Sequence, residues 1–296
     1  KKFPKLFYAH ECVGTVTETG ATESGYPAGT KVYAGTGDAG ATTLASGILA
    51  LGEYNINLGT SGWVAAVSNR RMESEGGGFN LAAMQKDLLI NVVPFLNGGN
   101  AHRLIAKILS RNPDGAPDFG YISELLEKAE PGSHGLFFLP YVAGERFPIM
   151  DSSVRGSFLG FSQETTAADM AQSVLEGVAF AIRDSFEVAK SLGIAIPRSN
   201  VCGGGAKSPL WRRIFANVLG IPLDMVKTEQ GPGYGAAMLA MVGCGKFKSV
   251  QEAADKLVEV ASTTEPDAAL TAKYEARYQN FKKLYPALKE FFAATV

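Results

Sequence analysis

Three glycine-rich turns hold the residues of this sequence whose types and spacing could do chemistry. They are residues 35–40 (Gly-Thr-Gly-Asp-Ala-Gly), 57–62 (Asn-Leu-Gly-Thr-Ser-Gly) and 203–206 (Gly-Gly-Gly-Ala). Each turn follows an apolar run that is typical of a β-strand, and each is small enough for phosphate oxygens to approach backbone N–H groups. The first turn also carries Asp38, an acid that phosphate binding alone does not require. The combination predicts a nucleotide-binding site.

Each of these features also has a simpler structural explanation. Asp38 stands immediately before a predicted helix, where Asp is a favoured N-cap residue. Residues 59–62 fit a plain hairpin connection, in which glycine supplies the positive φ. Arg146, Arg155 and the three histidines are more typical of solvated or packing positions than of a site. The nucleotide prediction therefore depends on the three turns occurring together.

Two further nucleotide motifs match only in part. Residues 35–40 fit the G-x-G-x-x-G dinucleotide fingerprint, which keeps a nicotinamide-dependent oxidoreductase as an alternative. The acid expected at the end of the next strand is missing, because Glu53 precedes strand 54–58. Residues 204–208 resemble a phosphate-binding P-loop, but Ala206 replaces the glycine before Lys207, and a Walker A site is rejected.

Strand-like and helix-like segments alternate along the chain, which indicates an α/β architecture. Strands are expected at 31–34, 54–58, 63–67, 88–96, 136–142, 200–202 and 223–226. Helices are expected at 39–51, 101–109, 122–129, 166–192, 210–219, 234–242 and 270–294, the last one broken near Pro286. Residues 152–162 are expected to form a loop. Segments 54–58 and 63–67 read as a hairpin around the second glycine-rich turn.

The composition is that of a globular protein with a sizeable core. The 296 residues are 46% hydrophobic and 19% charged with a formal net charge of -1, so neither nucleic acid nor a membrane is an expected partner. Three cysteines and three histidines are widely spaced, which predicts neither a disulfide framework nor a zinc site. The sequence shows no signal peptide and no apolar run of about twenty residues, and a cytoplasmic location is expected.

Seven motifs, taken in order, resemble the C-terminal half of the FGGY carbohydrate kinases, and within that family most closely its xylulokinases. They are Gly-Thr-Gly-Asp-Ala at 35–39, Asn-Leu-Gly-Thr-Ser-Gly at 57–62, Phe-Leu-Pro-Tyr-Val-Ala-Gly-Glu-Arg-Phe-Pro at 138–148, Arg-Gly-Ser-Phe-Leu-Gly at 155–160, Val-Leu-Glu-Gly-Val-Ala at 174–179, Gly-Gly-Gly-Ala-Lys-Ser at 203–208 and Gly-Pro-Gly-Tyr-Gly-Ala-Ala at 231–237. No single motif is sufficient, but their common order over nearly the whole chain makes the set specific.

The resemblance implies an α/β fold of the actin-like ATPase (ribonuclease H-like) type, with a mixed sheet flanked by helices. It implies that Asp38 is the catalytic base, which accepts a proton from a sugar hydroxyl as the γ-phosphoryl group of ATP arrives. Mg²⁺ would accompany the ATP and neutralise phosphate charge, without a metal-binding residue of this chain. The cofactor-binding residues that it implies are Gly37, then Gly59 and Thr60 at the phosphates, Gly99 and Arg103 beside the nucleotide, and Gly204, Gly205 and Ser208 facing the adenosine. His102 stands near the place where relatives commonly have tryptophan.

The same resemblance divides the chain after residue 30. Residues 1–30 are expected to be the remnant of an inter-domain connection with its first strands, and 31–296 the C-terminal nucleotide-binding domain, whereas the N-terminal sugar-binding domain lies outside the sequence. The implied activity is phosphorylation of D-xylulose to D-xylulose 5-phosphate, with gluconate or another sugar or polyol as the alternative. The chain alone is then expected to be inactive, with the sugar, ATP, its N-terminal domain and a second copy in a homodimer as partners. A non-catalytic actin-like nucleotide-binding module is the remaining possibility.

Overall fold

The computed structural model describes residues 4–73, 77–191, 193, 195–227 and 231–295. Its strands are β1 (Cys12–Thr15), β2 (Lys31–Tyr33), β3 (Tyr54–Leu58), β4 (Gly62–Ser68), β5 (Phe79–Ala82), β6 (Leu89–Phe95), β7 (Phe137–Leu139), β8 (Ser157–Leu159), β9 (Ser199–Cys202), β10 (Leu223–Val226) and β11 (Val260–Thr264). Its helices are α1 (Glu18–Ser24), α2 (Asp38–Ala45), α3 (Gly99–Ile108), α4 (Phe119–Leu126), α5 (Ala167–Ser191), α6 (Pro209–Leu219), α7 (Gly231–Gly243), α8 (Val250–Leu257), α9 (Ala268–Phe281) and α10 (Leu284–Thr295), together with the short 3-10 helices η1 (Ser133–Gly135) and η2 (Gly204–Lys207).

A seven-stranded sheet lies at the centre of the fold, in the order β11-β10-β9-β3-β4-β6-β5. Strands β3, β9 and β10 run parallel, and the other neighbours pair antiparallel. β3 and β4 form the expected hairpin, in register from Tyr54 opposite Ala66 to Leu58 opposite Gly62. The predicted α/β class with a mixed sheet is confirmed.

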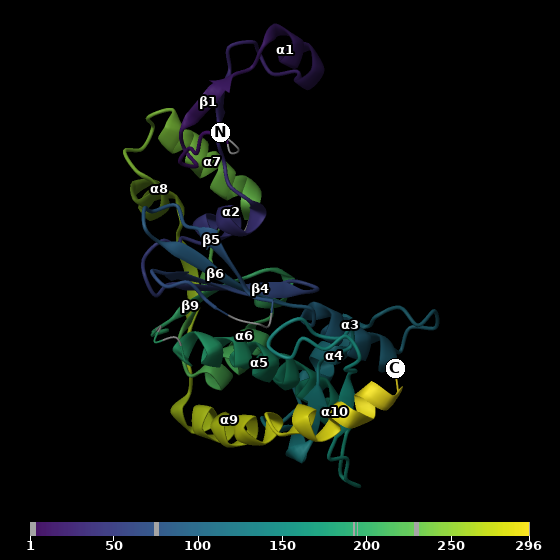
Figure 1. The fold of residues 1–296 in the computed structure, drawn as a ribbon. Helices are drawn as coiled ribbons and strands as arrows, with labels where there is room; N and C mark the ends of the chain where they lie inside the picture. Colours follow the sequence, from purple (N-terminus) through teal and green to yellow (C-terminus); the bar gives the residue numbers. More distant parts are fainter. Residues whose placement is uncertain (1–3, 74–76, 192, 194, 228–230, 296) are drawn as a thin grey trace.

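Helices cover both faces of this sheet (Figure 1). α2, α7 and α8 lie above one face, whereas α3, α4, α5 and α6 lie beneath the other. α9 and α10 form a further layer below them. β1 and β2 pair in a separate two-stranded sheet, which with α1 extends away from the body at the top of the view.

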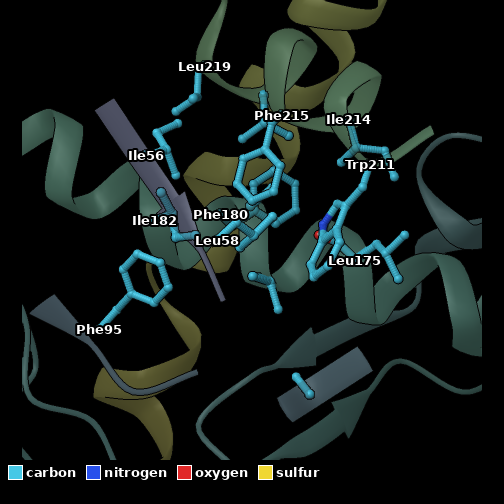
Figure 2. Close-up of a cluster of buried hydrophobic side chains, with 14 of the residues drawn as sticks. Ile56, Leu58, Phe95, Leu175, Phe180, Ile182, Trp211, Ile214, Phe215 and Leu219 are labelled. Carbon is cyan, nitrogen blue, oxygen red and sulfur yellow. The ribbon is translucent and has the colours of Figure 1, made fainter. Parts of the chain in front are cut away.

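The main hydrophobic core lies between the sheet and α5. Tyr54, Ile56 and Leu58 of β3 are at most 1% exposed and belong to this core, as the two-residue period of a strand requires. Figure 2 shows Ile56 and Leu58 in one cluster with Phe180 of α5 and Trp211 of α6. Each fully buried large apolar side chain contributes about 1.5–3 kcal/mol, so this layer is the main source of stability.

A second hydrophobic cluster holds α2, α7 and α8 together. Its buried members are Leu44, Leu49, Met238, Leu239, Val242, Val250, Ala253 and Ala254. α2 and α7 approach each other most closely at Gly235, where a Cβ would lie 2.7 Å from the carbonyl carbon of Ala41 and closer still to its oxygen. These helices therefore have a core of their own above the sheet.

Several boundaries differ from the sequence prediction for local reasons. The helix expected at 39–51 ends at Ala45, because Gly47 takes a left-handed conformation with φ of 75°. α9 and α10 are separated at 282–283, and Pro286 lies in the first turn of α10, where an N–H is not needed. Within the expected loop 152–162, β8 pairs with β7. Leu192, the expected last residue of the long helix, lies outside the described residues.

Replacing Asp184 on α5 is expected to remove a pH dependence of stability. The Tyr278 hydroxyl donates a hydrogen bond of 2.6 Å to Asp184, and burial raises the pKa of Asp184 to about 6. The folded state thus binds this proton more tightly than the unfolded state, whose pKa is about 4. The stabilisation is complete below that unfolded pKa and is lost as pH rises through about 6. Asp184 retains some exposed surface, which screens the charge, so the loss is at most about 3 kcal/mol.

Thermal unfolding from about pH 4 to about pH 8 measures this contribution. Asp184→Asn, whose side-chain oxygen can still accept from Tyr278, should become more stable relative to the wild type as pH rises. Glu187→Gln changes a more exposed acid of the same helix, whose charge ranks below burial among the causes that raise the pKa of Asp184, and it should keep most of the wild-type pH dependence. A difference between Asp184→Asn and the wild type that stays constant with pH would contradict the assignment.

Candidate functional site

A cavity of about 500 Å³ opens between the sheet and α2, at the edge where β3, β9 and β10 end. Its wall is formed by Asp38, Thr42, Ala45, Ser46, Asn57, Trp63, Cys202, Gly203, Gly204, Lys207, Val226, Gly231 and Pro232. The carboxyl ends of parallel strands are where open α/β sheets bind ligands. Of the residues predicted for the site, Asp38 and Gly204 are part of this wall.

The floor of the cavity is a row of side chains that crosses three strands. Trp63 of β4 stands opposite Asn57 of β3, and Asn57 is in register with Cys202 of β9. Residues paired in this way point to the same face of a sheet. Asn55 points the same way, and the Cys202 thiol donates to its side-chain oxygen at 3.5 Å. This face of the sheet is therefore polar at β3 and β9, whereas the opposite face of β3 is apolar and belongs to the main core.

One side of α2 forms the facing wall. Asp38, Thr42, Ala45 and Ser46 line the cavity, and their spacing places them along one side of a helix. The carbonyl of Ser46 accepts a hydrogen bond from the side chain of Asn200 on β9, which anchors the carboxyl end of α2 to the sheet.

The start of α2 differs in detail from the sequence prediction. Gly37 is the N-cap, with φ of -67° and ψ of 166°, and Asp38 is the first helical residue, so the N-cap role expected for Asp38 is wrong. Asp38 is exposed, and its Oδ1 accepts a hydrogen bond of 2.8 Å from the backbone N–H of Ala39. This bond orients the carboxylate at the N-terminus of α2.

A second helix also begins at the cavity. Gly231 and Pro232, in the first turn of α7, contribute to its wall. The first N–H groups of a helix have no intrahelical acceptor, and this end carries a partial positive charge. Lys207, at the end of η2, adds a full positive charge. Two helix starts and one lysine around a single cavity favour an anionic ligand such as phosphate.

The second glycine-rich turn is tied to the start of α3 by main-chain hydrogen bonds. The carbonyl of Gly59 accepts from the N–H of Gly99 at 2.8 Å, and that of Thr60 accepts from the N–H groups of Gly98 and Asn100 at 3.2 and 3.1 Å. A Cβ on Gly99 would lie 3.0 Å from the Gly59 oxygen, so a larger residue would push the two segments apart. The predicted residues Gly59, Thr60 and Gly99 thus lie together at the end of β3.

Glu145, which was not predicted, braces the loop before α3. It is 4% exposed and accepts hydrogen bonds from the N–H of Leu96 at 2.8 Å and from the side-chain amide of Asn97 at 2.9 Å. Burial raises the pKa of the Glu145 carboxyl, while the bond from Asn97 acts in the opposite direction. The carboxyl therefore joins β6 and the loop before α3 to the segment around residue 145.

The third glycine-rich segment divides into residues with different roles. Gly203 has φ of 91°, and a Cβ there would lie 2.6 Å from the carbonyl oxygen of Leu58. Gly205 packs against the side chains of Leu58 and Trp211, which a Cβ would approach to 2.5 and 2.9 Å. Ser208 is the N-cap of α6 and accepts a backbone N–H of its first turn at 3.2 Å. Packing and capping account for Gly205 and Ser208 without a ligand.

Two predicted residues lie away from the cavity that contains Asp38. Ser208 lines a second cavity, of about 610 Å³, between α4, α5, α6 and α9. Arg103 is exposed on α3 and is not among the described residues that line either cavity. Their nucleotide-binding roles remain predictions.

His102 lies in the aromatic packing beside the start of α3. Its ring is edge-on to Phe119 at 5.2 Å and to Trp211 at 5.4 Å between centroids. Its Nε2 is buried, with no hydrogen-bond partner in the described part of the chain. Burial lowers the pKa of His102, so the ring is neutral at neutral pH and packs as an apolar group.

Several residues of the cavity had no predicted role, and different signals point to them. Thr42 follows Asp38 by one helical turn, which the sequence could have revealed. Trp63 and Asn57 share the floor only because of the pairing register of β3 with β4. Lys207 was considered only as part of a rejected P-loop, and its place in the wall depends on the position of η2.

In the described ranges, no group of three or more His, Cys, Asp or Glu side chains is arranged to hold a metal ion. Within the same ranges, none of the helices has the length and apolar character needed to cross a membrane.

The arrangement of sheet, helices and cavity is the actin-like ATPase fold. A xylulose kinase from Rhodospirillum rubrum superimposes on the chain with a TM-score of 0.87 at 28% identity, covering 98% of this chain and 58% of that one. A gluconate kinase from Lactobacillus acidophilus shares the fold with a TM-score of 0.90 at 24% identity, covering 99% and 59%.

Sequence comparison gives the family within that fold. The model of the FGGY family of carbohydrate kinases, C-terminal domain, matches residues 54–244, and the chain belongs to this family. A xylulose kinase from Staphylococcus epidermidis is 31% identical over 292 residues, which are 98% of this chain and 58% of that protein. A gluconokinase from Bacillus subtilis is 25% identical over 244 residues, 80% of this chain and 48% of that protein. The matched regions thus span about half the length of these relatives.

Proposed function

We propose that this chain is the nucleotide-binding part of an ATP-dependent sugar kinase, which transfers the γ-phosphoryl group to a sugar hydroxyl. One observation carries the proposal: Asp38 lines the same cavity as Gly203, Gly204 and Lys207, where two helices begin. Phosphoryl transfer to an alcohol needs a base at the hydroxyl and positive groups around the phosphates, and this cavity offers both. Membership of the FGGY family supports the same activity.

Asp38 is the proposed general base. Its carboxylate accepts the proton of the sugar hydroxyl as the hydroxyl oxygen attacks phosphorus, while the Ala39 N–H holds the carboxylate in place. The N–H groups at the start of α7, together with Lys207, stabilise negative charge on the phosphate oxygens. Gly59 and Thr60 form the turn that holds the end of β3 against α3.

The residues around the cavity fit ATP with Mg²⁺. Glycine main chain and Lys207 suit a triphosphate, and Mg²⁺ in such sites is typically held by one or two carboxylates, phosphate oxygens and water. Asp38, the carboxylate that the described wall provides, is assigned to the sugar hydroxyl, so Mg²⁺ would be held by phosphate oxygens and water. When bound, ATP supplies the phosphoryl group and Mg²⁺ reduces the charge of its phosphates.

D-xylulose is the proposed acceptor, with D-xylulose 5-phosphate as the product. The greater similarity to a xylulose kinase than to a gluconokinase supports this choice. Most of the sugar contacts are assigned to an N-terminal domain, which is the proposed partner of the domain at residues 31–296. Gluconate is the second candidate, because kinases named for it share the fold.

The acceptor is identified by sugar-dependent release of ADP from the full-length protein. We expect D-xylulose to be used with a kcat/KM at least about tenfold above those for L-ribulose, gluconate and glycerol. A preference for gluconate would keep the mechanism and change the substrate. ATP binding without stimulation by any of these sugars would overturn the kinase proposal and select the non-catalytic module.

The nicotinamide-dependent alternative requires a strand and helix arrangement that differs from the one around residues 35–40. A dinucleotide fingerprint connects a strand of the parallel sheet to its following helix. β2, the strand before residues 35–40, instead pairs with β1 in the separate two-stranded sheet. Fluorescence titration of the chain with NADH should therefore show no tight binding.

A further inference from the structure

We propose that Trp63 is a specificity-determining residue that contacts the sugar at the acceptor end of the cavity. This inference rests on the proposed kinase function and names a residue of this chain that selects the acceptor. Sequence motifs gave Trp63 no role, and its place in the cavity follows from the pairing of β3 with β4.

The position of α2 over the sheet brings Asp38 to the side of the cavity where Trp63 lies. The carboxyl end of α2 is anchored on β9 by the hydrogen bond from Asn200. Near its other end, a Cβ on Gly40 would lie 3.4 Å from the Cε of Met84, which follows β5. α2 therefore crosses β3 and β4 on its way from the β5 side to β9, and β4 carries Trp63 beneath this path.

The two ends of the cavity differ in charge. Val226 and Gly231 line it at β10, next to Lys207, whereas Trp63 lines it at β4. β4 and β10 are separated by three strand spacings, or about 14 Å. The cationic end suits the phosphates, and the end with the uncharged indole beside Asp38 suits a neutral polyhydroxylated acceptor.

The indole offers both kinds of contact that a sugar uses. The ring of Trp63 packs in the small cluster of Ala65, Ile90 and Val92, which fixes its orientation. Its ring gives an apolar surface for the C–H groups of a sugar. Its Nε1–H is buried and has no acceptor in the described part of the chain. Leaving such a donor unpaired is unfavourable, and a small shift of the indole that uncovers the N–H would let a sugar hydroxyl accept from it and remove this penalty.

Steady-state kinetics of the full-length protein test this role. Trp63→Ala should raise the KM for the best sugar at least about tenfold, while the KM for ATP stays within about twofold. Trp63→Phe keeps an aromatic surface without the N–H and should give an intermediate KM. Leu81→Ala, which removes an apolar side chain of the same cluster outside the cavity, should leave both KM values near those of the wild type.

The outcomes separate the inference from the proposed function. Wild-type turnover with an unchanged sugar KM in both Trp63 variants overturns the inference alone. A rise confined to the KM for ATP also overturns it and moves Trp63 to the nucleotide end. A wild type that phosphorylates none of the sugars overturns the kinase function and the inference with it. Sugar should also change the tryptophan fluorescence of the wild type, and loss of this change in Trp63→Phe would support direct contact.

Discussion

Asp38→Asn is expected to lower sugar-dependent ADP formation by the full-length protein by about 10²–10⁴-fold, the usual contribution of a general base. Asparagine has nearly the same shape and can still accept the Ala39 N–H, but it cannot take the proton of the sugar hydroxyl. Because Asp38 is exposed, the fold should survive the change. The loss of charge at a helix start costs only about 0.3–1 kcal/mol.

The control is a second exposed acid with the same change of charge. Asp114→Asn lies in a loop where the side chain accepts the N–H of Ala116, a bond that asparagine retains. Its turnover should match the wild type, and ADP affinity should be similar in all three proteins. Full activity of Asp38→Asn would remove Asp38 from the mechanism, even if the protein is a kinase.

Gly235→Ala is expected to destabilise the protein and to impair catalysis at a distance. The new methyl group would overlap the main chain of Ala41, so α2 and α7 must separate. Overpacking of this kind costs about 1–3 kcal/mol, and in a chain of this size the melting temperature should fall by several degrees. Asp38 begins the helix that is displaced, and a shift of about 1 Å at a catalytic group can cost about 10²-fold in rate.

Gly233 provides a matched substitution on the same helix. A Cβ at Gly233 meets nothing within 4 Å, so Gly233→Ala adds a better helix former without a collision. Its melting temperature should equal or exceed that of the wild type. Equal melting temperatures for the two alanine variants would contradict the prediction, because they would show that α2 and α7 accommodate the methyl group at residue 235 without loss of stability.

The elements with long apolar patterns are those that the sequence predicted best. α5 repeats apolar residues at Val174, Val178 and Ile182, all buried, and β3 alternates as a half-polar strand should. β5, β8, β11, α1 and α8 were not predicted, and β1 was expected only as an unplaced strand within residues 1–30. β1 is exposed throughout, α1 has no buried residue and β11 is mostly exposed, so their sequences lack the periodicity that burial imposes.

The site was predictable where chemistry is visible in the sequence itself. Asp38 is an acid inside a glycine-rich turn, and it lines a cavity of about 500 Å³, whereas its catalytic role stays a prediction. The position of Trp63 in the cavity could not be predicted from the sequence. It depends on strand register and on the direction of α2, and both result from tertiary packing. For Ser208, motif similarity predicts a contact with adenosine. The hydrogen bond that its side chain accepts as the N-cap of α6 explains the residue without a ligand.

Three glycines, Gly203, Gly204 and Gly231, contribute main chain to the cavity wall. Main-chain N–H groups cannot be deleted by replacing a side chain, so such a wall is insensitive to the chemistry of a substitution and sensitive to its bulk. At Gly204 a Cβ would meet nothing within 4 Å, whereas at Gly203 it would collide with Leu58. Substitutions at these two adjacent glycines should therefore have different effects. A side chain at Gly203 would disturb the fold, whereas a side chain at Gly204 would leave the fold intact and occupy part of the cavity.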